Sequence, residues 1–307
     1  MTRGGSFGHV VRSMISVVVV SATACSPAGR PSTEEGASLA SRAERRPGPH
    51  RIECRESVVD LVEEEPAFAP PARRVGGRTL VPVTFPDGTS VELVYPSRLD
   101  LAGLGVYPGT SAALADPYST RGLDMSRGVA RALVEGDTPL GCYRGFRGSQ
   151  VELWRAADPD RYIDYWLFFR FGAWTVAIWD DDDQPFGLSE RQRARWAAGL
   201  RARETRRGWL VFGSAPPLRL HVEEKGWGDP HLQFGNLRLT LFPADCRPFE
   251  EVPTTTIGSR RVHLYKGTRH WFAEWCDPLA SMVATMEGTG RFLRSVAREL
   301  EVRAAGP

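Results

Sequence analysis

The feature of the sequence that most restricts its fold is a series of β-rich runs arranged in pairs around short turns. The first pair encloses a Pro-Asp-Gly-Thr turn at 86–89, and the second encloses Gly172 and Ala173. Two β-rich runs joined by such a turn indicate an antiparallel hairpin. The predicted hairpins pair 80–85 with 90–95, 166–171 with 174–179, and 271–275 with 282–286.

Two segments have helical signals. Ser189 and Gln192 match a capping box, which predicts a helix from there to about Glu204. Its inner face is expected to carry Trp196, Ala197 and Leu200. Near the C-terminus, apolar residues spaced by three and four predict one face of a last helix: Phe292, Leu293, Val296, Ala297 and Leu300. These signals predict an α+β fold in which antiparallel sheets are each closed by an amphipathic helix.

The order of these elements suggests an internal duplication. Residues 148–154 resemble residues 258–265, and each copy is followed by a hairpin and a helix. The alternative is one larger α+β domain in which similar hairpins recur. The predicted organisation is a signal peptide at 1–24, a lipidated cysteine and flexible tether at 25–50, an extended lead-in at 51–75, and α+β subdomains at 76–206 and 207–307.

The N-terminus is typical of an export signal. A basic lead with Arg3 and Arg12 precedes a short apolar run at 14–20, which is shorter than the about 20 apolar residues that span a bilayer. Small residues follow and lead into Cys25. Here Thr23, Ala24 and Cys25 resemble the lipobox of bacterial lipoproteins.

The lipoprotein resemblance implies cleavage before Cys25, acylation of its thiol with palmitate-type chains, and attachment to the outer face of the cell membrane. The alternatives are a signal peptide cleaved after Ala24 without lipidation, or a segment retained in the cytoplasm. Residues 26–49 are rich in Ser, Pro, Gly, Glu and Arg. Such a composition buries too little apolar surface to offset the entropy of ordering, which predicts a flexible tether.

Cysteine content agrees with export. Beyond Cys25, the four cysteines Cys54, Cys142, Cys246 and Cys276 form an even set, which in an exported chain predicts two disulfides. Of the three possible pairings, we expect Cys54 with Cys142 and Cys246 with Cys276.

Charge and composition exclude some classes of partner. The formal net charge is +2, which does not favour nucleic acid. Of the 39 basic residues only Lys225 and Lys266 are lysines, which leaves 37 arginines and reduces the significance of any one arginine cluster. Seven arginines of the first helical region are expected to form one basic helix face, which either contacts anionic headgroups or is solvated: Arg191, Arg193, Arg195, Arg201, Arg203, Arg206 and Arg207.

Two further features are candidates for ligand binding. The acidic run at 180–183, with Asp180, Asp182 and Asp183 as candidate ligands, suits a hard cation, but it equally suits a solvated turn ahead of a helix N-terminus. The aromatic residues Trp166, Phe168 and Trp174 form either a ligand groove or core packing under the helices.

The sequence contains no zinc-binding or nucleotide-binding motif, so no cofactor is predicted. It also has no nucleophile motif between a predicted strand and a predicted helix. His263 and His270 flank a loop and are expected to be structural. The chain is therefore expected to be a lipid-anchored envelope protein, a binding or structural module whose partner is the membrane and an unknown envelope component or small ligand. The alternative is a secreted hydrolase with carboxylates from separate loops.

Overall fold

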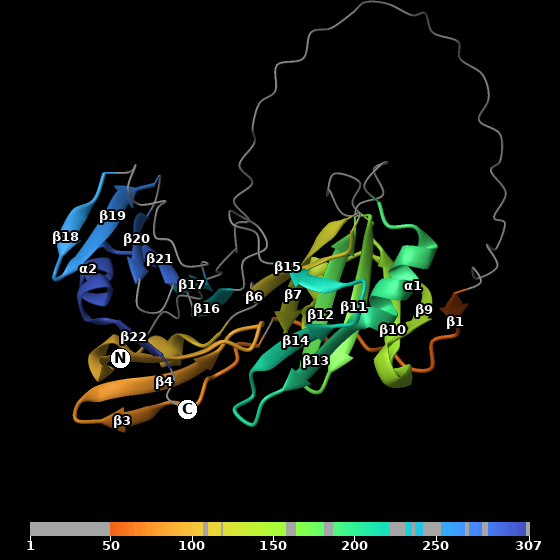
Figure 1. Ribbon diagram of the computed structural model, residues 1–307, viewed down its shortest axis with the longest axis horizontal. Helices are drawn as coiled ribbons and strands as arrows, with labels where there is room; N and C mark the ends of the chain where they lie inside the picture. Colours follow the sequence, from red (N-terminus) through yellow and green to blue (C-terminus); the bar gives the residue numbers. More distant parts are fainter. Residues whose placement is uncertain are drawn as a thin grey trace, which may run out of the picture. The chain divides into compact units, whose positions relative to one another are not determined.

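The computed structural model describes residues 50–64, 66–106, 110–117, 119–157, 164–180, 187–221, 231–234, 237–241, 253–267, 270–277 and 282–304 (Figure 1). The predicted signal peptide, Cys25 and the tether up to Pro49 lie outside the described residues. Asp182, Asp183 and Cys246 do so as well.

The largest sheet has eight strands, and every neighbouring pair is antiparallel. Its strands, in spatial order, are β1 (Arg51–Ile52), β9 (Thr138–Arg144), β10 (Gln150–Arg155), β11 (Tyr165–Phe171), β12 (Trp174–Asp180), β7 (Thr120–Ser126), β6 (Thr110–Ala115) and β15 (Arg219–His221). Strands β11 and β12 pair along their whole length, which confirms the predicted aromatic hairpin.

The second sheet has six strands: β16 (His231–Phe234), β17 (Leu237–Leu241), β21 (Met282–Gly288), β20 (Trp271–Asp277), β19 (Arg260–Lys266) and β18 (Thr255–Ile257). The pairing of β20 with β21 confirms the third predicted hairpin. Both large sheets contain the same pattern, in which four consecutive strands are followed, on one side, by two strands that precede them in the chain. The order is β9-β10-β11-β12-β7-β6 in one sheet and β18-β19-β20-β21-β17-β16 in the other.

Shorter sheets complete the β structure. One consists of β22 (Glu301–Ala304), β5 (Ser90–Pro96), β4 (Arg78–Thr84) and β3 (Arg73–Val75), and another of β13 (Leu200–Glu204) and β14 (Leu210–Ser214). Strands β2 (Leu61–Val62) and β8 (Val129–Ala130) form a parallel pair. The β4–β5 pairing confirms the first predicted hairpin. Its turn needs a residue in the left-handed region, and Gly88 supplies it with a φ of 94°.

The helices are short. They are α1 (Glu190–Gly199), α2 (Gly290–Glu299) and the 3₁₀ turns η1 (Ser97–Leu99), η2 (Leu101–Leu104), η3 (Arg131–Leu133) and η4 (Phe146–Gly148). Ser189 and Gln192 form the predicted capping box at the start of α1. The predicted end at Glu204 is wrong, because α1 stops at Gly199 and Leu200 begins strand β13. Gly199 allows the close approach of Leu218, whose Cδ1 would lie 2.5 Å from an added Cβ.

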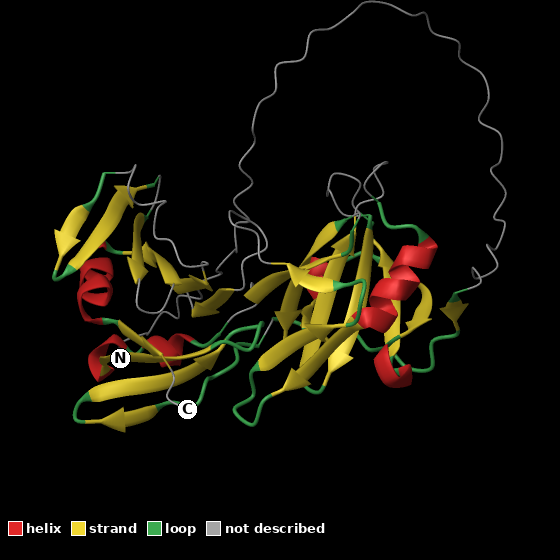
Figure 2. Cartoon of the chain, viewed as in Figure 1, coloured by secondary structure: helices red, strands yellow, loops and turns green. Residues whose placement is uncertain are grey.

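The α+β prediction is wrong: the described residues form a β-rich fold in which strands predominate and the helices are short (Figure 2). They include twenty-two strands and two ten-residue α-helices. The main core explains the difference. Buried residues of α1 and α2 belong to the same apolar cluster as residues of both large sheets and of strands β4, β5, β14 and β22. Strands of the shorter sheets therefore supply much of the buried surface that the sequence analysis assigned to helices.

Strand pairs also connect the two sides of the predicted boundary at 206/207. Strand β15 pairs with β6, and the C-terminal strand β22 pairs with β5, about two hundred residues earlier. A bridge between Val106 and Phe234 makes a third such connection. The residues assigned to the two predicted subdomains thus share sheets.

Candidate functional site

The predicted aromatic groove is divided between two faces of the largest sheet. Trp166 and Phe168 lie on one face, where their rings stack at 5.8 Å, and they belong to a small apolar cluster separate from the main core. Trp174 lies in the main core, and its ring meets that of Phe68 edge-on at 5.6 Å. The alternation of side chains along β11 and β12 causes this division. The structure therefore brings together Trp166 and Phe168, but not Trp174.

The face with Trp166 and Phe168 is covered by a segment of the N-terminal lead-in. We call residues 54–62 the strap. Val58 and Val59 of the strap are buried in the same cluster as Trp154, Trp166 and Phe168. Their packing fills the position expected for a ligand.

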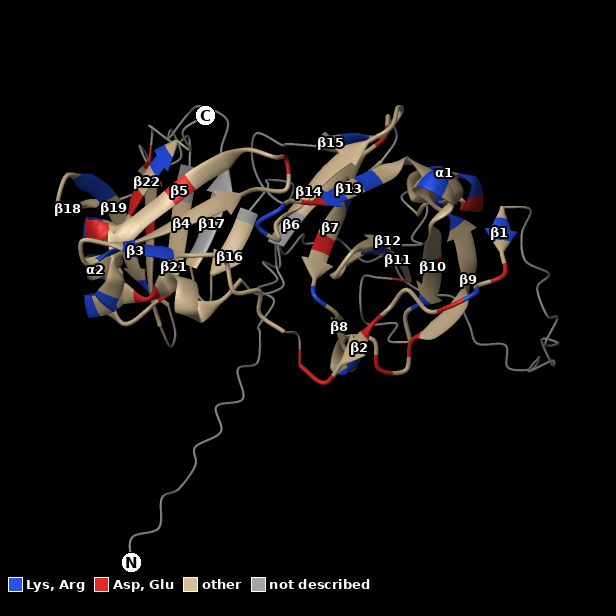
Figure 3. Ribbon diagram, turned by 90° about the horizontal axis from the view of Figure 1, so that it is seen from below, with Lys and Arg blue, Asp and Glu red and all other residues tan. Residues whose placement is uncertain are grey.

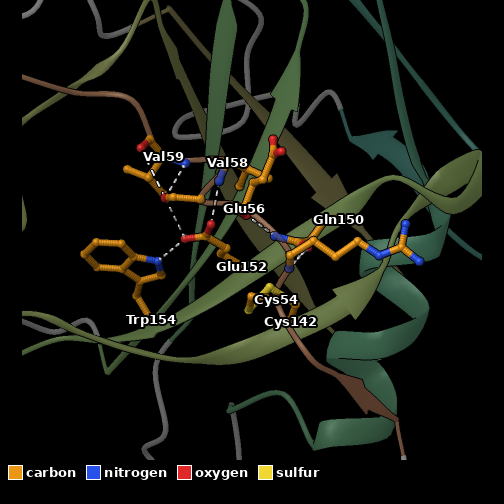
Figure 4. Close-up of a disulfide and its surroundings, with 10 residues drawn as sticks. Cys54, Glu56, Val58, Val59, Cys142, Gln150, Glu152 and Trp154 are labelled. Carbon is orange, nitrogen blue, oxygen red and sulfur yellow. Dashed lines mark hydrogen bonds between the residues drawn. A yellow bond between two sulfur atoms is a disulfide. The ribbon is translucent and has the colours of Figure 1, made fainter.

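Strand β10 holds the strap through alternate side chains, as Figure 4 shows. Gln150 Oε1 accepts a hydrogen bond from the backbone N–H of Arg55 at 2.8 Å, and Gln150 Nε2 donates to the carbonyl of Glu56. Two residues along the strand, Glu152 accepts from the backbone N–H of Val58.

Glu152 is a buried carboxylate, with 3% of its surface exposed. Besides the Val58 amide it accepts hydrogen bonds from Trp154 Nε1 at 2.7 Å and from Ser57 Oγ at 3.4 Å. These neutral donors compensate for part of the cost of removing the charge from water. Sequence reasoning missed Gln150 and Glu152, because polar residues alternating with Val151 and Leu153 look like the solvent-facing side of a strand.

A disulfide closes the N-terminal end of the strap. Cys54 is bonded to Cys142 with a Cα–Cα distance of 5.3 Å, which confirms this predicted pair. Cys142 lies opposite Glu152 in the β9–β10 ladder, so the disulfide and the carboxylate hold neighbouring parts of the strap. Cys276 is also disulfide-bonded, and its partner is not among the described residues. The pairing of Cys276 with Cys246 stays a prediction.

Asp180, a candidate cation ligand, is the centre of a buried ion-pair cluster. Its Oδ1 accepts from Arg121 Nε at 3.1 Å and its Oδ2 from Arg193 Nε at 2.8 Å, while the N–H of Leu188 donates to Oδ1 at 3.0 Å. The carboxylate is fully buried. With both oxygens accepting from cationic or backbone donors, Asp180 is suited to hold β12, β7 and α1 together, and poorly suited to bind a cation.

No three His, Cys, Asp or Glu side chains of the described ranges lie close enough to hold a metal ion. Arg193 comes from α1, thirteen residues after Asp180 in the sequence. Arg121 lies on β7, and no local pattern connects it with Asp180.

The basic residues predicted for one helix face are spread over three elements. Arg191, Arg193 and Arg195 lie on α1, whereas Arg201 and Arg203 lie on β13, and Arg206 and Arg207 in the turn before β14 (Figure 3). Arg193 is buried against Asp180, and its guanidinium lies 4.0 Å above the ring of Tyr165. A single basic helix face is therefore not formed.

The two histidines expected to flank a loop are held separately. His263 Nδ1 lies 2.8 Å from the carbonyl oxygen of Pro253, and His270 Nε2 lies 3.5 Å from Glu287 Oε1. In the β19–β20 ladder His263 faces Glu274. His263 shares its face of the sheet with Tyr265 and Phe272, whose rings stack at 5.1 Å.

Tyr265 is a titratable reporter of this face. Burial, followed by the charge of the Glu274 carboxylate and the hydrogen bond to it, raises the pKa of Tyr265 to about 12. Unfolded tyrosine ionises near pH 10. The folded chain thus binds one proton more than the unfolded chain between about pH 10 and pH 12, and its stability falls through that window as the pH rises.

We expect Glu274→Gln to lower the pKa of Tyr265, because it removes the nearby negative charge. An ultraviolet absorbance titration of the phenolate, taken as the difference from the same variant carrying Tyr265→Phe, measures this shift. Glu287→Gln is the matched control, since the carboxylate of Glu287 pairs with His270 instead. Equal shifts from both variants would contradict the assignment.

Comparisons with protein-family models, with curated proteins and with solved structures return no match. In the described part of the chain no helix is both long and apolar enough to cross a membrane.

Proposed function

We propose that this chain is an exported, lipid-anchored binding module of the cell envelope. The observation that carries the export is the Cys54–Cys142 disulfide. Disulfides form and persist in oxidising compartments outside the cytoplasm, where an export signal leads. A tether ending at a lipidated Cys25 leaves residues from His50 onward free to fold off the membrane surface.

A non-catalytic role is supported by how the chain uses two of its buried carboxylates. Glu152 accepts from the strap and from Trp154, and Asp180 accepts from two guanidiniums and a backbone amide. A general acid or base must be able to reach a substrate proton. Because each of these carboxylates is engaged with protein donors, they favour a role in structure and recognition over the alternative of a hydrolase.

Replacing Cys25 with serine tests the anchor. We expect Cys25→Ser to abolish lipidation, because the thiol that accepts the acyl group is gone. The chain should then be released or remain as an uncleaved precursor, since stable anchoring needs two acyl chains. Membrane fractionation and intact mass of the expressed protein measure the outcome. Ser26→Ala, which keeps the thiol, is the control. A Cys25→Ser chain that fractionates and migrates like the parent would refute the anchor.

A further inference from the structure

Strand β10 contacts the strap in the way that a peptide-binding surface contacts a peptide backbone. Gln150 accepts from one backbone N–H of the strap and donates to the next carbonyl, and Glu152 accepts from another backbone N–H. These hydrogen bonds go to main-chain groups, so they do not depend on which side chains the strap carries. Hydrogen bonds to main-chain groups together with apolar pockets for side chains are a common means of recognising a peptide segment.

The surface beneath the strap supplies the apolar part of such a site. Trp154 and Trp166 each contact the ring of Phe168, at 5.7 Å and 5.8 Å. Val58 and Val59 are buried in this cluster. Trp166 Nε1 is buried and has no hydrogen-bond partner among the described residues, so one donor of this surface is not used by the strap.

The strap itself is weakly attached by backbone contacts. Strand β1 precedes the strap and strand β2 forms its end. Each is two residues long and pairs with one neighbouring strand among the described residues. From Arg55 to Val58 its hydrogen bonds to the sheet run to the side chains of Gln150 and Glu152. The disulfide is the covalent link that keeps this segment in place.

We propose that the face formed by Gln150, Glu152, Trp154, Trp166 and Phe168 is a binding site for a peptide segment with two adjacent apolar residues, and that the strap is its built-in occupant. This inference rests on the proposed role as a binding module and names the ligand class of its site. A partner segment of the same chemistry replaces the strap when the Cys54–Cys142 bond is open.

A dithiol reductant opens that bond by ordinary exchange. One of its thiolates attacks Sγ of Cys54, because Cys54 is exposed whereas Cys142 is fully buried. The S–S bond breaks, and Cys142 leaves as a thiolate that takes up a proton. The second thiolate of the reductant then attacks the reductant's first sulfur, which is bonded to Cys54 in the mixed disulfide. This step releases the Cys54 thiolate, which is protonated by water, and the oxidised cyclic reductant.

The test uses the full chain with Cys54→Ser and Cys142→Ser, which opens the strap without touching the disulfide of Cys276. We expect hydrogen exchange at the Val58 amide to accelerate at least tenfold, while the amides of Val176 and Ile178 in β12 keep their protection. A synthetic peptide of residues 55–62 should bind this variant at least tenfold more tightly than the oxidised parent, as read by tryptophan emission. The same peptide with Val58→Ser and Val59→Ser should lose that binding.

Three results would overturn the proposal: unchanged exchange at Val58, no preference of the peptide for the opened variant, or equal binding of the serine-substituted peptide. If the double variant loses protection throughout β12, Glu152→Gln in the disulfide-intact chain provides the test. There the Val58 amide should exchange at least fivefold faster with β12 unaffected, and an unchanged Val58 amide refutes the inference. Because these measurements use no membrane, their failure is distinct from a failure of the Cys25 anchor.

Discussion

Replacing Asp180 with asparagine is expected to lower the free energy of unfolding by about 3–5 kcal/mol, the usual cost of removing one partner from a buried ion pair. The side chain is fully buried, and both Arg121 and Arg193 direct guanidinium N–H groups at it within 3.1 Å. Asparagine keeps the shape and one acceptor oxygen but removes the charge that offsets the burial of two cations. Urea unfolding followed by circular dichroism measures the change.

Asp60→Asn is the matched control for this prediction. Asp60 is exposed, so the same chemical change there should alter stability by no more than about 0.5 kcal/mol. If both variants unfold at the same urea concentration as the parent, Asp180 does not hold β7, β12 and α1 together. A loss in Asp180→Asn that Asp60→Asn lacks would support the ion-pair cluster as a main link between these elements.

Trp209→Ala is expected to cost a similar amount, about 3–5 kcal/mol, because it leaves a large cavity in the main core. The Trp209 ring is 1% exposed and lies edge-on to Phe68 at 5.0 Å and to Phe234 at 6.2 Å. Its Nε1 donates to the carbonyl of Pro82 at 3.1 Å. One side chain thus contacts β4, the lead-in and β16, and its removal also leaves that carbonyl without its donor.

The comparison for this prediction is Trp271→Ala. Trp271 is 37% exposed, so its removal deletes less buried contact and should cost about 2 kcal/mol or less. Thermal unfolding of the two variants measures the difference. Equal losses of stability would contradict the central position of Trp209 in the core.

Local features of the fold were predictable from sequence. The Pro-Asp-Gly-Thr turn, the Gly172-Ala173 turn and the capping box of Ser189 each depend on residues a few positions apart, and each forms as predicted. The Cys54–Cys142 pair belongs to one of the three pairings that four cysteines allow, and it forms as predicted. The end of α1 was not, since Leu200 leaves the helix only because β14 is available to pair with it.

In the candidate site, too, sequence predicted some features and missed those that depend on distant segments. Sequence reasoning selected Trp166 and Phe168 as unusual, and both lie on the face that the strap covers. It did not find Gln150 or Glu152, whose partners are about 95 residues away along the chain. It also placed Trp174 beside Trp166, although the register of β11 with β12 puts their side chains on opposite faces.

The sequence by itself determined three β-hairpins, the start of the helix after Ser189 and the apolar face of the C-terminal helix, because those outcomes follow from residues a few positions apart. Only the tertiary structure decided that strands would take the place expected for helices, that β22 would join β5, and that Glu152 and Asp180 would be buried against donors from distant segments. The physical reason is that burial and pairing between distant strands are properties of the assembled core. Alternating side chains indicate that a strand has two faces, but they do not indicate which element will cover each face.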